Sequence, residues 1–272
     1  MLNNFFQAII MGIIQGITEF LPISSTAHLV IYHQFSNSPI INNLTFDVVL
    51  HAGTLIALII YFFQEIIELI KGFFLSIFKP NWRSDLRQRL SGFIIFASLP
   101  ILIIGYFFGD FLENNLRNIL VIIVSLIGVG MLFIIVEKKV KTLRNLETIN
   151  LGDSFFIGLA QVLALIPGVS RSGITIVAGM SKKLMRRASA KFTFLLAIPA
   201  IFGAAVKQFL KINFNNLTND LILIYLVGFL TAFLAGFFSL KFFFNFLKNH
   251  TLIGFAVYRF ILAIILIFIF IL

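Results

Sequence analysis

The residues most suited to chemistry lie between positions 15 and 28, in the stretch Gln-Gly-Ile-Thr-Glu-Phe-Leu-Pro-Ile-Ser-Ser-Thr-Ala-His. Gln15 and Glu19 are four residues apart, so on a helix their side chains share one face. One carboxylate and one amide oxygen do not enclose a cation, but they suit Mg²⁺ or Ca²⁺, which take oxygen ligands and retain waters or substrate phosphates. The alternative is that Glu19 pairs with a basic side chain for packing alone. The spacing leaves both interpretations open.

A run of hydroxyl groups and a histidine follows Pro22. If a helix begins near Ser24, then Ser25 and His28 lie three residues apart on one face. His28 could then activate a hydroxyl or a water as general base, and the N–H groups at the helix start could bind an anion beside Ser24 and Thr26. The alternative is ordinary capping with a buried histidine, and spacing alone favours it.

A second polar cluster occupies residues 167–175, Pro-Gly-Val-Ser-Arg-Ser-Gly-Ile-Thr. Its centre is Arg171, whose planar guanidinium matches phosphate oxygens. Gly168 allows close backbone approach, and hydroxyl groups add hydrogen-bond donors around Arg171: Ser170, Ser172 and Thr175. We expect Arg171 to bind an anion rather than to form a structural bridge to Glu19.

Three further polar residues lie near apolar segments. Arg259 could pair with Glu19 or Asp47, or could assist the anion, and the sequence leaves these options open. Asp47 and His51 stand at the start of an apolar segment, where we expect them at the membrane interface.

Composition indicates the setting of these clusters. Sixty per cent of the 272 residues are apolar, 12% are charged and the mean hydropathy is +1.04. Because soluble domains are about half apolar and about a quarter charged, we expect an integral membrane protein. The absence of cysteine excludes disulfides and thiolate metal sites. No cleavable signal precedes the first apolar segment, which we expect to be retained.

Two apolar segments are interrupted by proline, glycine and the polar clusters, over 5–33 and 152–180. Each half of either segment is too short to cross a bilayer, which takes roughly 20 residues, so we expect re-entrant helix pairs. Uninterrupted spans are predicted at about 46–70, 92–108, 117–136, 190–210, 221–241 and 251–272. Residues 71–90 are expected to form a soluble connection, and residues 109–115 a short turn.

The predicted fold is all-α and polytopic, in one integral membrane domain, 1–272. A charged linker, 137–150, joins repeat 1, about 1–136, to repeat 2, about 151–272. A shift of 146 residues superposes Gly12 on Gly158, Gln15 on Gln161 and Ser24 on Ser170. Each half holds one re-entrant pair and three crossings. Because three is odd, the halves should have opposite orientation, an inverted-topology repeat.

Loop charge tests this topology. Alternation places 71–90, 137–150, 181–191 and 241–250 on one side, and most Lys and Arg residues lie there. The opposite side holds only Arg117, Lys207 and Lys211. The basic side is therefore expected to be cytoplasmic, and the net charge of +10 needs no nucleic-acid partner. The two polar tips should then meet near the middle of the membrane.

The motifs resemble those of a bacterial family. Residues 15–28 resemble the first signature of the undecaprenyl-diphosphatase (bacitracin-resistance) family, a Glu/Gln-x-x-x-Glu box leading into Pro-x-Ser-Ser-x-x-His. Residues 167–175 resemble its second signature, Pro-Gly-x-Ser-Arg-Ser-x-x-Thr, and residues 192–199 and Tyr258-Arg259 also match family segments. The resemblance covers essentially the full length, in order.

The resemblance implies an inner-membrane enzyme that removes the terminal phosphate of undecaprenyl diphosphate, acts towards the outer face and needs a divalent cation. Glu19 and Gln15 would hold the metal, Arg171 the diphosphate, Ser25 would be the nucleophile and His28 the acid/base. This chain has Gln15 where many relatives have Glu, which removes one possible metal carboxylate. The other residues expected at the substrate are Ser24, Thr26, Gly168, Ser170, Ser172, Thr175 and Arg259.

Two other functions are compatible with parts of the pattern. A lipid-phosphate flippase or anion transporter would share inverted repeats with a midplane site, but would cleave no bond. A second type of membrane lipid phosphatase is disfavoured because its Pro-Ser-Gly-His segment is absent. The sequence leaves a homodimer possible.

Overall fold

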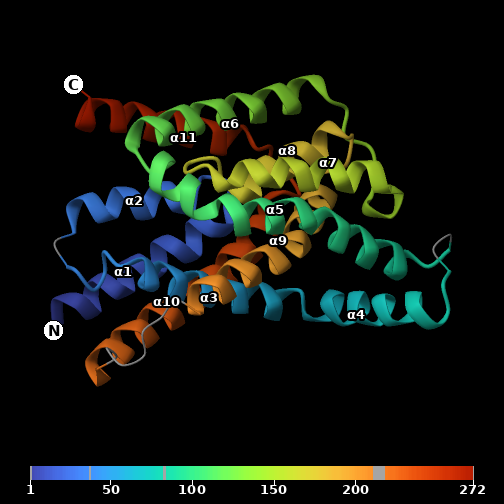
Figure 1. Ribbon diagram of the computed structural model, residues 1–272. Helices are drawn as coiled ribbons and strands as arrows, with labels where there is room; N and C mark the ends of the chain where they lie inside the picture. Colours follow the sequence, from blue (N-terminus) through green and yellow to red (C-terminus); the bar gives the residue numbers. More distant parts are fainter. Residues whose placement is uncertain (1, 37, 82–83, 211–217, 272) are drawn as a thin grey trace.

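The computed structural model describes residues 2–36, 38–81, 84–210 and 218–271, and these residues are helical apart from short connections (Figure 1). The first half forms α1 (Leu2–Phe20), α2 (Ser25–Phe35), α3 (Leu44–Tyr61), α4 (Phe63–Phe78), α5 (Leu86–Leu116) and α6 (Ile119–Lys139). The second half forms η1 (Leu146–Thr148), α7 (Leu151–Val162), η2 (Leu163–Leu165), α8 (Arg171–Ser181), α9 (Arg186–Phe209), α10 (Asn219–Phe246) and α11 (Ile253–Phe270). The predicted all-α fold is confirmed.

Within the described residues, five helices are long and apolar enough to cross a membrane: α5, α6, α9, α10 and α11. A sixth crossing exists if α3 and α4 are counted together, although they meet at an angle of 79° around Phe62. The prediction of one uninterrupted span at about 46–70 is therefore wrong, because the segment is divided between α3 and α4. Residues 71–78 belong to α4 rather than to a soluble connection, since Ile and Phe residues give this stretch an apolar face that a helix can pack.

The predicted turn at 109–115 is also wrong, because α5 continues to Leu116. The connection lies instead between Leu116 and Ile119, where the side chain of Asn118 accepts a hydrogen bond from the N–H of Val121 and caps α6. Asn118 thus marks the start of α6, because a short polar side chain satisfies the first free N–H groups of a helix.

Both interrupted segments form helix–turn–helix pairs, as predicted. α2 and α8 are each 11 residues long, too short to span a bilayer. Ser24 and Ser170 cap these two helices through their hydroxyl oxygens, which accept hydrogen bonds from the N–H groups of Ala27 and Gly173. Both serines also adopt positive φ, 76° and 71°, which is uncommon for residues with a side chain. The two tips thus share one unusual backbone conformation.

The two halves exchange helices in their packing. α1 packs along α10, and α7 packs along α5. A Cβ at Gly12 would lie 2.8 Å from the carbonyl oxygen of Gly228, and one at Gly158 would collide with the carbonyl oxygen of Ala97. The matched glycines therefore allow the same close approach in each half. This reciprocity agrees with a two-fold relation between the halves, and the inverted topology stays a prediction.

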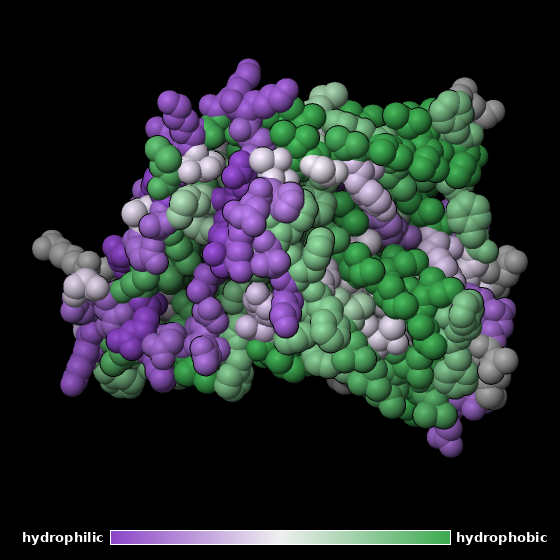
Figure 2. Space-filling model, turned by 180° about the vertical axis from the view of Figure 1, so that it is seen from behind, coloured by the Kyte–Doolittle hydropathy of each residue, from purple (hydrophilic) through white to green (hydrophobic). Residues whose placement is uncertain are grey.

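The basic connections gather at one end of the molecule. Linker residue Arg144 pairs with Leu184 in an isolated β-bridge, and Glu137 binds Arg186 and accepts a hydrogen bond from the N–H of Leu252. This end also carries the α4–α5 connection, whereas α1 begins and α11 ends at the opposite one (Figure 1). Hydrophilic side chains cluster at the basic end, beside a mostly hydrophobic region (Figure 2).

The grouping predicted from loop charge is thus confirmed for the described residues. Two of the basic residues used for the loop-charge prediction, Arg83 and Lys211, lie outside the described residues.

Candidate functional site

Glu19 is the point at which the two polar tips meet. Its carboxylate oxygen Oε2 accepts hydrogen bonds from Ser25 Oγ (2.7 Å) and Gln15 Nε2 (3.0 Å), and lies 3.4 Å from Nδ1 of His51. Its other oxygen, Oε1, lies 3.8 Å from NH1 of Arg171 in the second half. The carboxylate is almost fully buried, with 6% of the side chain exposed. One carboxylate therefore connects side chains from α1, α2, α3 and α8.

Arg171 is held loosely in this arrangement. Its Nε and NH1 atoms are buried and make no hydrogen bond to the described residues, since the distance to Glu19 exceeds hydrogen-bond length. Buried donors of a charged group are costly to leave unpaired. This geometry favours the predicted anion site over a structural bridge, because an oxyanion would satisfy both atoms.

The hydroxyl groups around Arg171 have mostly local roles. Thr175 Oγ1 donates to the carbonyl oxygen of Arg171, and the hydroxyl groups of Ser170 and Ser172 hydrogen-bond each other at 3.2 Å. Gly168 has φ of +91°, a left-handed conformation that suits glycine. These residues shape the second tip around the guanidinium, and their predicted contact with substrate stays a prediction.

His28 contacts the backbone of the first tip and Tyr258 of α11. Its Nδ1 contacts the carbonyl oxygen of Ser24 at 2.7 Å, and its Nε2 contacts the hydroxyl of Tyr258 at 2.7 Å. The ring also stacks on that of Tyr258, with centroids 5.8 Å apart. Because both nitrogens already have partners, His28 anchors the first tip to α11.

His51, rather than His28, is the histidine whose ring lies beside the Glu19 carboxylate. Besides facing the carboxylate, its Nδ1 lies 2.9 Å from Gln15 Nε2. His51 therefore belongs to the site, and its expected position at the membrane interface stays a prediction. The sequence did contain a signal for a polar site on α3. Asp47 and His51 are four residues apart, so their side chains share one face of the helix.

Arg259 is fully buried and binds the backbone rather than a carboxylate. It donates to the carbonyl oxygens of Pro22 (3.3 Å) in the first tip and Gly168 (2.9 Å) in the second. It also donates to carbonyl oxygens of Val169, Ser125 and Leu126. Arg259 thus ties the two tips together and to α6, so the predicted pairing with Glu19 or Asp47 is not formed.

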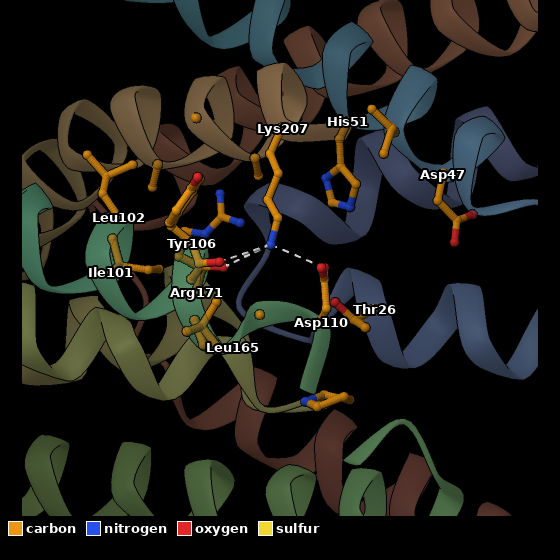
Figure 3. Close-up of a pocket in the computed structure, with 18 of the residues that line it drawn as sticks. Thr26, Asp47, His51, Ile101, Leu102, Tyr106, Asp110, Leu165, Arg171 and Lys207 are labelled. Carbon is orange, nitrogen blue, oxygen red and sulfur yellow. Dashed lines mark hydrogen bonds and ion pairs between the residues drawn. The ribbon is translucent and has the colours of Figure 1, made fainter. Parts of the chain in front are cut away.

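A cavity of about 650 Å³ opens beside the two tips (Figure 3). Thr26, His51 and Arg171 form part of its wall, and a large apolar surface completes it, chiefly from α5, η2 and α9. Other charged residues in the wall are Asp47, Asp110, Arg117 and Lys207. Such a space, apolar with a few charged groups, suits a lipid that carries an anionic head.

The candidate metal ligands fit an open cation site. The described residues contain no group of three or more His, Cys, Asp or Glu side chains able to hold a metal. However, Gln15 Oε1 is buried without a hydrogen-bond partner, on the same amide group whose Nε2 donates to the Glu19 carboxylate. An unpaired amide oxygen and one carboxylate fit a hard divalent cation that keeps waters or phosphate oxygens as its other ligands.

The fold and site together define an all-helical, polytopic membrane protein with a polar site between two helix–turn–helix tips. The family model described as bacitracin resistance protein BacA matches residues 8–265, and the chain belongs to this family. A relative from Thermodesulfovibrio yellowstonii, named undecaprenyl-diphosphatase, is 44% identical over 97% of both chains. Relatives with the same name from Moorella thermoacetica (38% identical, 97% of both chains) and Alcanivorax borkumensis (36%, 97% and 98%) are also similar. The predicted family is confirmed.

Proposed function

We propose that this protein is an undecaprenyl-diphosphatase, which hydrolyses undecaprenyl diphosphate to undecaprenyl phosphate and inorganic phosphate. This activity would recycle the lipid carrier of cell-wall synthesis and confer bacitracin resistance. The names of the similar relatives support the substrate. The observation that carries the proposal is the contact of Ser25 Oγ with the Glu19 carboxylate at 2.7 Å, next to Arg171, whose buried Nε and NH1 have no hydrogen-bond partner among the described residues.

In this proposal the two tips divide the chemistry. Arg171 holds the terminal phosphate and neutralises charge that develops on its oxygens. Ser25, or a water in contact with it, attacks the phosphorus while Glu19 accepts the proton from the attacking hydroxyl. The P–O bond to the lipid phosphate then breaks. If Ser25 is the nucleophile, a water completes the cycle by releasing the phosphate from it.

A divalent cation, Mg²⁺ or Ca²⁺, held by Glu19 and Gln15 would add positive charge beside the diphosphate. His28 receives a different role from the acid/base function implied by the family resemblance. Because its nitrogens bind Ser24 and Tyr258, we infer that it positions the first tip. Arg259 would likewise position both tips rather than bind substrate.

We further propose that the protein lies in the bacterial inner membrane with its basic connections in the cytoplasm, following the positive-inside rule. The cavity wall includes Arg117 and Lys207, which the predicted topology places on the side opposite the basic connections. The site would therefore open towards the outer face.

The test measures phosphate release from undecaprenyl diphosphate by purified protein in detergent, with Mg²⁺ and with EDTA. We expect metal-dependent release that is lost in Arg171→Ala, while Lys241→Ala, which removes an exposed charge from α10, serves as the matched control. Loss in Ser25→Ala would support a covalent serine intermediate, and its survival would assign the attack to water. A folded wild-type protein that releases no phosphate with any divalent cation would refute the enzyme and favour the flippase.

A further inference from the structure

The cavity wall carries three cationic side chains among the described residues, Arg117, Arg171 and Lys207, together with the carboxylates of Asp47 and Asp110. Arg171 belongs to the reacting centre beside Glu19. A lipid diphosphate has two phosphate groups, each anionic at neutral pH, and one guanidinium fork pairs with one of them. The second phosphate therefore needs another cation.

Arg117 is already paired in a way that holds it in place. Its NH2 lies 3.1 Å from the carboxylate of Asp47, which is nearly buried and also contacts the ring of His33 at 3.0 Å. Moving Arg117 to a ligand would leave that buried carboxylate without its arginine partner, a costly exchange.

Lys207 has looser partners. Its ammonium lies 3.1 Å from the carboxylate of Asp110, whose side chain is 60% exposed, and it donates to the carbonyl oxygens of Gly105 at 3.4 Å and Tyr106 at 3.2 Å. Such an ion pair with an exposed carboxylate contributes little to stability, because water solvates the released partner. Figure 3 shows Lys207 reaching from α9 across the cavity to these α5 groups.

The surroundings of Lys207 suit the end of a lipid phosphate. On the α5 side the ammonium lies over Gly105 and Gly109, and a Cβ at Gly109 would lie 3.6 Å from it. The wall beside it is apolar and includes Leu102 and Gly203. A cation bordered by apolar surface matches the junction between a phosphate and its hydrocarbon chain, whereas the leaving phosphate has no such chain.

We propose that Lys207 binds the phosphate that remains on the lipid, while Arg171 holds the phosphate that leaves. Asp110 is the competing counterion: it pairs with Lys207 and releases it when the lipid phosphate binds. This assignment rests on the proposed function for the identity of the substrate, and it makes Lys207 a binding residue with no part in bond cleavage.

The two partners of the pair give effects of opposite sign. Lys207→Gln should raise KM for undecaprenyl diphosphate by about tenfold or more, which corresponds to about 1.4 kcal/mol of binding, while kcat stays within about threefold. Lys207→Arg should retain most of the affinity. Asp110→Asn should lower KM, because Lys207 then loses its competitor. If Lys207 and Asp110 were only a structural pair, both Lys207→Gln and Asp110→Asn would change KM in the same direction, which would overturn the proposal.

Direct binding separates this proposal from the function itself. The increase in melting temperature produced by undecaprenyl phosphate reports binding without turnover. It should shrink in Lys207→Gln and be unchanged in Lys241→Gln, whereas inhibition by inorganic phosphate should be unaffected by Lys207→Gln. If the wild type releases no phosphate but still shows this binding pattern, the proposed phosphatase activity is refuted and the role of Lys207 stands. An active wild type whose Lys207→Gln variant binds undecaprenyl phosphate normally would refute only the role of Lys207.

Discussion

Arg259→Met tests whether the two tips are held by a buried cation. The side chain is replaced by an unbranched apolar one, so the helix keeps its packing while the guanidinium is lost. The carbonyl oxygens of Pro22, Gly168 and Val169 lie in the tips and accept hydrogen bonds from Arg259. If each loses its donor at a cost of about 1–3 kcal/mol, the folded state loses at least about 3 kcal/mol.

That loss corresponds to a fall of about 6 °C or more in melting temperature for a chain of this size. The assay is thermal unfolding of the detergent-purified variant, combined with the kinetics of phosphate release. We expect a lower melting temperature and a lower kcat with KM little changed, because misplaced tips affect the reacting geometry. Lys241→Met is the control, since it removes an exposed charge.

A direct substrate contact would give the reverse pattern. Had Arg259 bound the diphosphate, its replacement would raise KM and leave the melting temperature near the wild-type value. Arg259→Lys sharpens the comparison, because an ammonium keeps the charge but cannot reach both tips as the guanidinium does. Wild-type stability in both variants would refute the assignment of Arg259 as the link between the tips.

Three further outcomes follow from the same geometry. Glu19→Gln should lower kcat for phosphate release by about 10²–10⁴-fold, because it removes the proton acceptor. His28→Ala should lower kcat by no more than about tenfold. Equal losses of kcat in the two variants would contradict the assignment of Glu19 as the proton acceptor. Gln15→Glu should lower the Mg²⁺ concentration needed for half-maximal binding, measured by calorimetry without substrate. An unchanged titration would show that Gln15 is not a metal ligand. Gly158→Ala should destabilise by about 1–3 kcal/mol, whereas Gly128→Ala, with open space around it, should not lower the melting temperature.

The features that could be predicted from sequence are those with local causes. Pro22 and Gly168 interrupt apolar segments, and Ser24 lies where a cap is needed, so the two tips were visible as breaks in hydrophobicity. Charge in the connections indicated which ends lie together, because the cost of placing Lys and Arg in a bilayer acts on each connection separately. Such signals need no knowledge of which helices touch.

The features that could not be predicted depend on contacts between distant helices. His51 reaches Gln15 only because α3 packs beside α1, and His28 is engaged by Tyr258, 230 residues further along the chain. The bend at Phe62 was not predicted either, since no proline or glycine marks it. In each case the local pattern allowed several partners, and helix packing selected one.

The two tips use one scaffold for opposite chemical purposes. Ser24 and Ser170 have nearly the same backbone conformation and the same capping bond, so each tip presents the following residue in a similar position. That residue is Ser25 in the first half and Arg171 in the second. In the proposed mechanism, one tip offers a hydroxyl beside the carboxylate, and the other offers a cation to the phosphate. A site with two hydroxyls or two cations would lack either the anion clamp or the attacking group. The difference between the matched residues Ser25 and Arg171, with Arg259 contacting both tips, would give two similar tips the asymmetry that this hydrolysis requires.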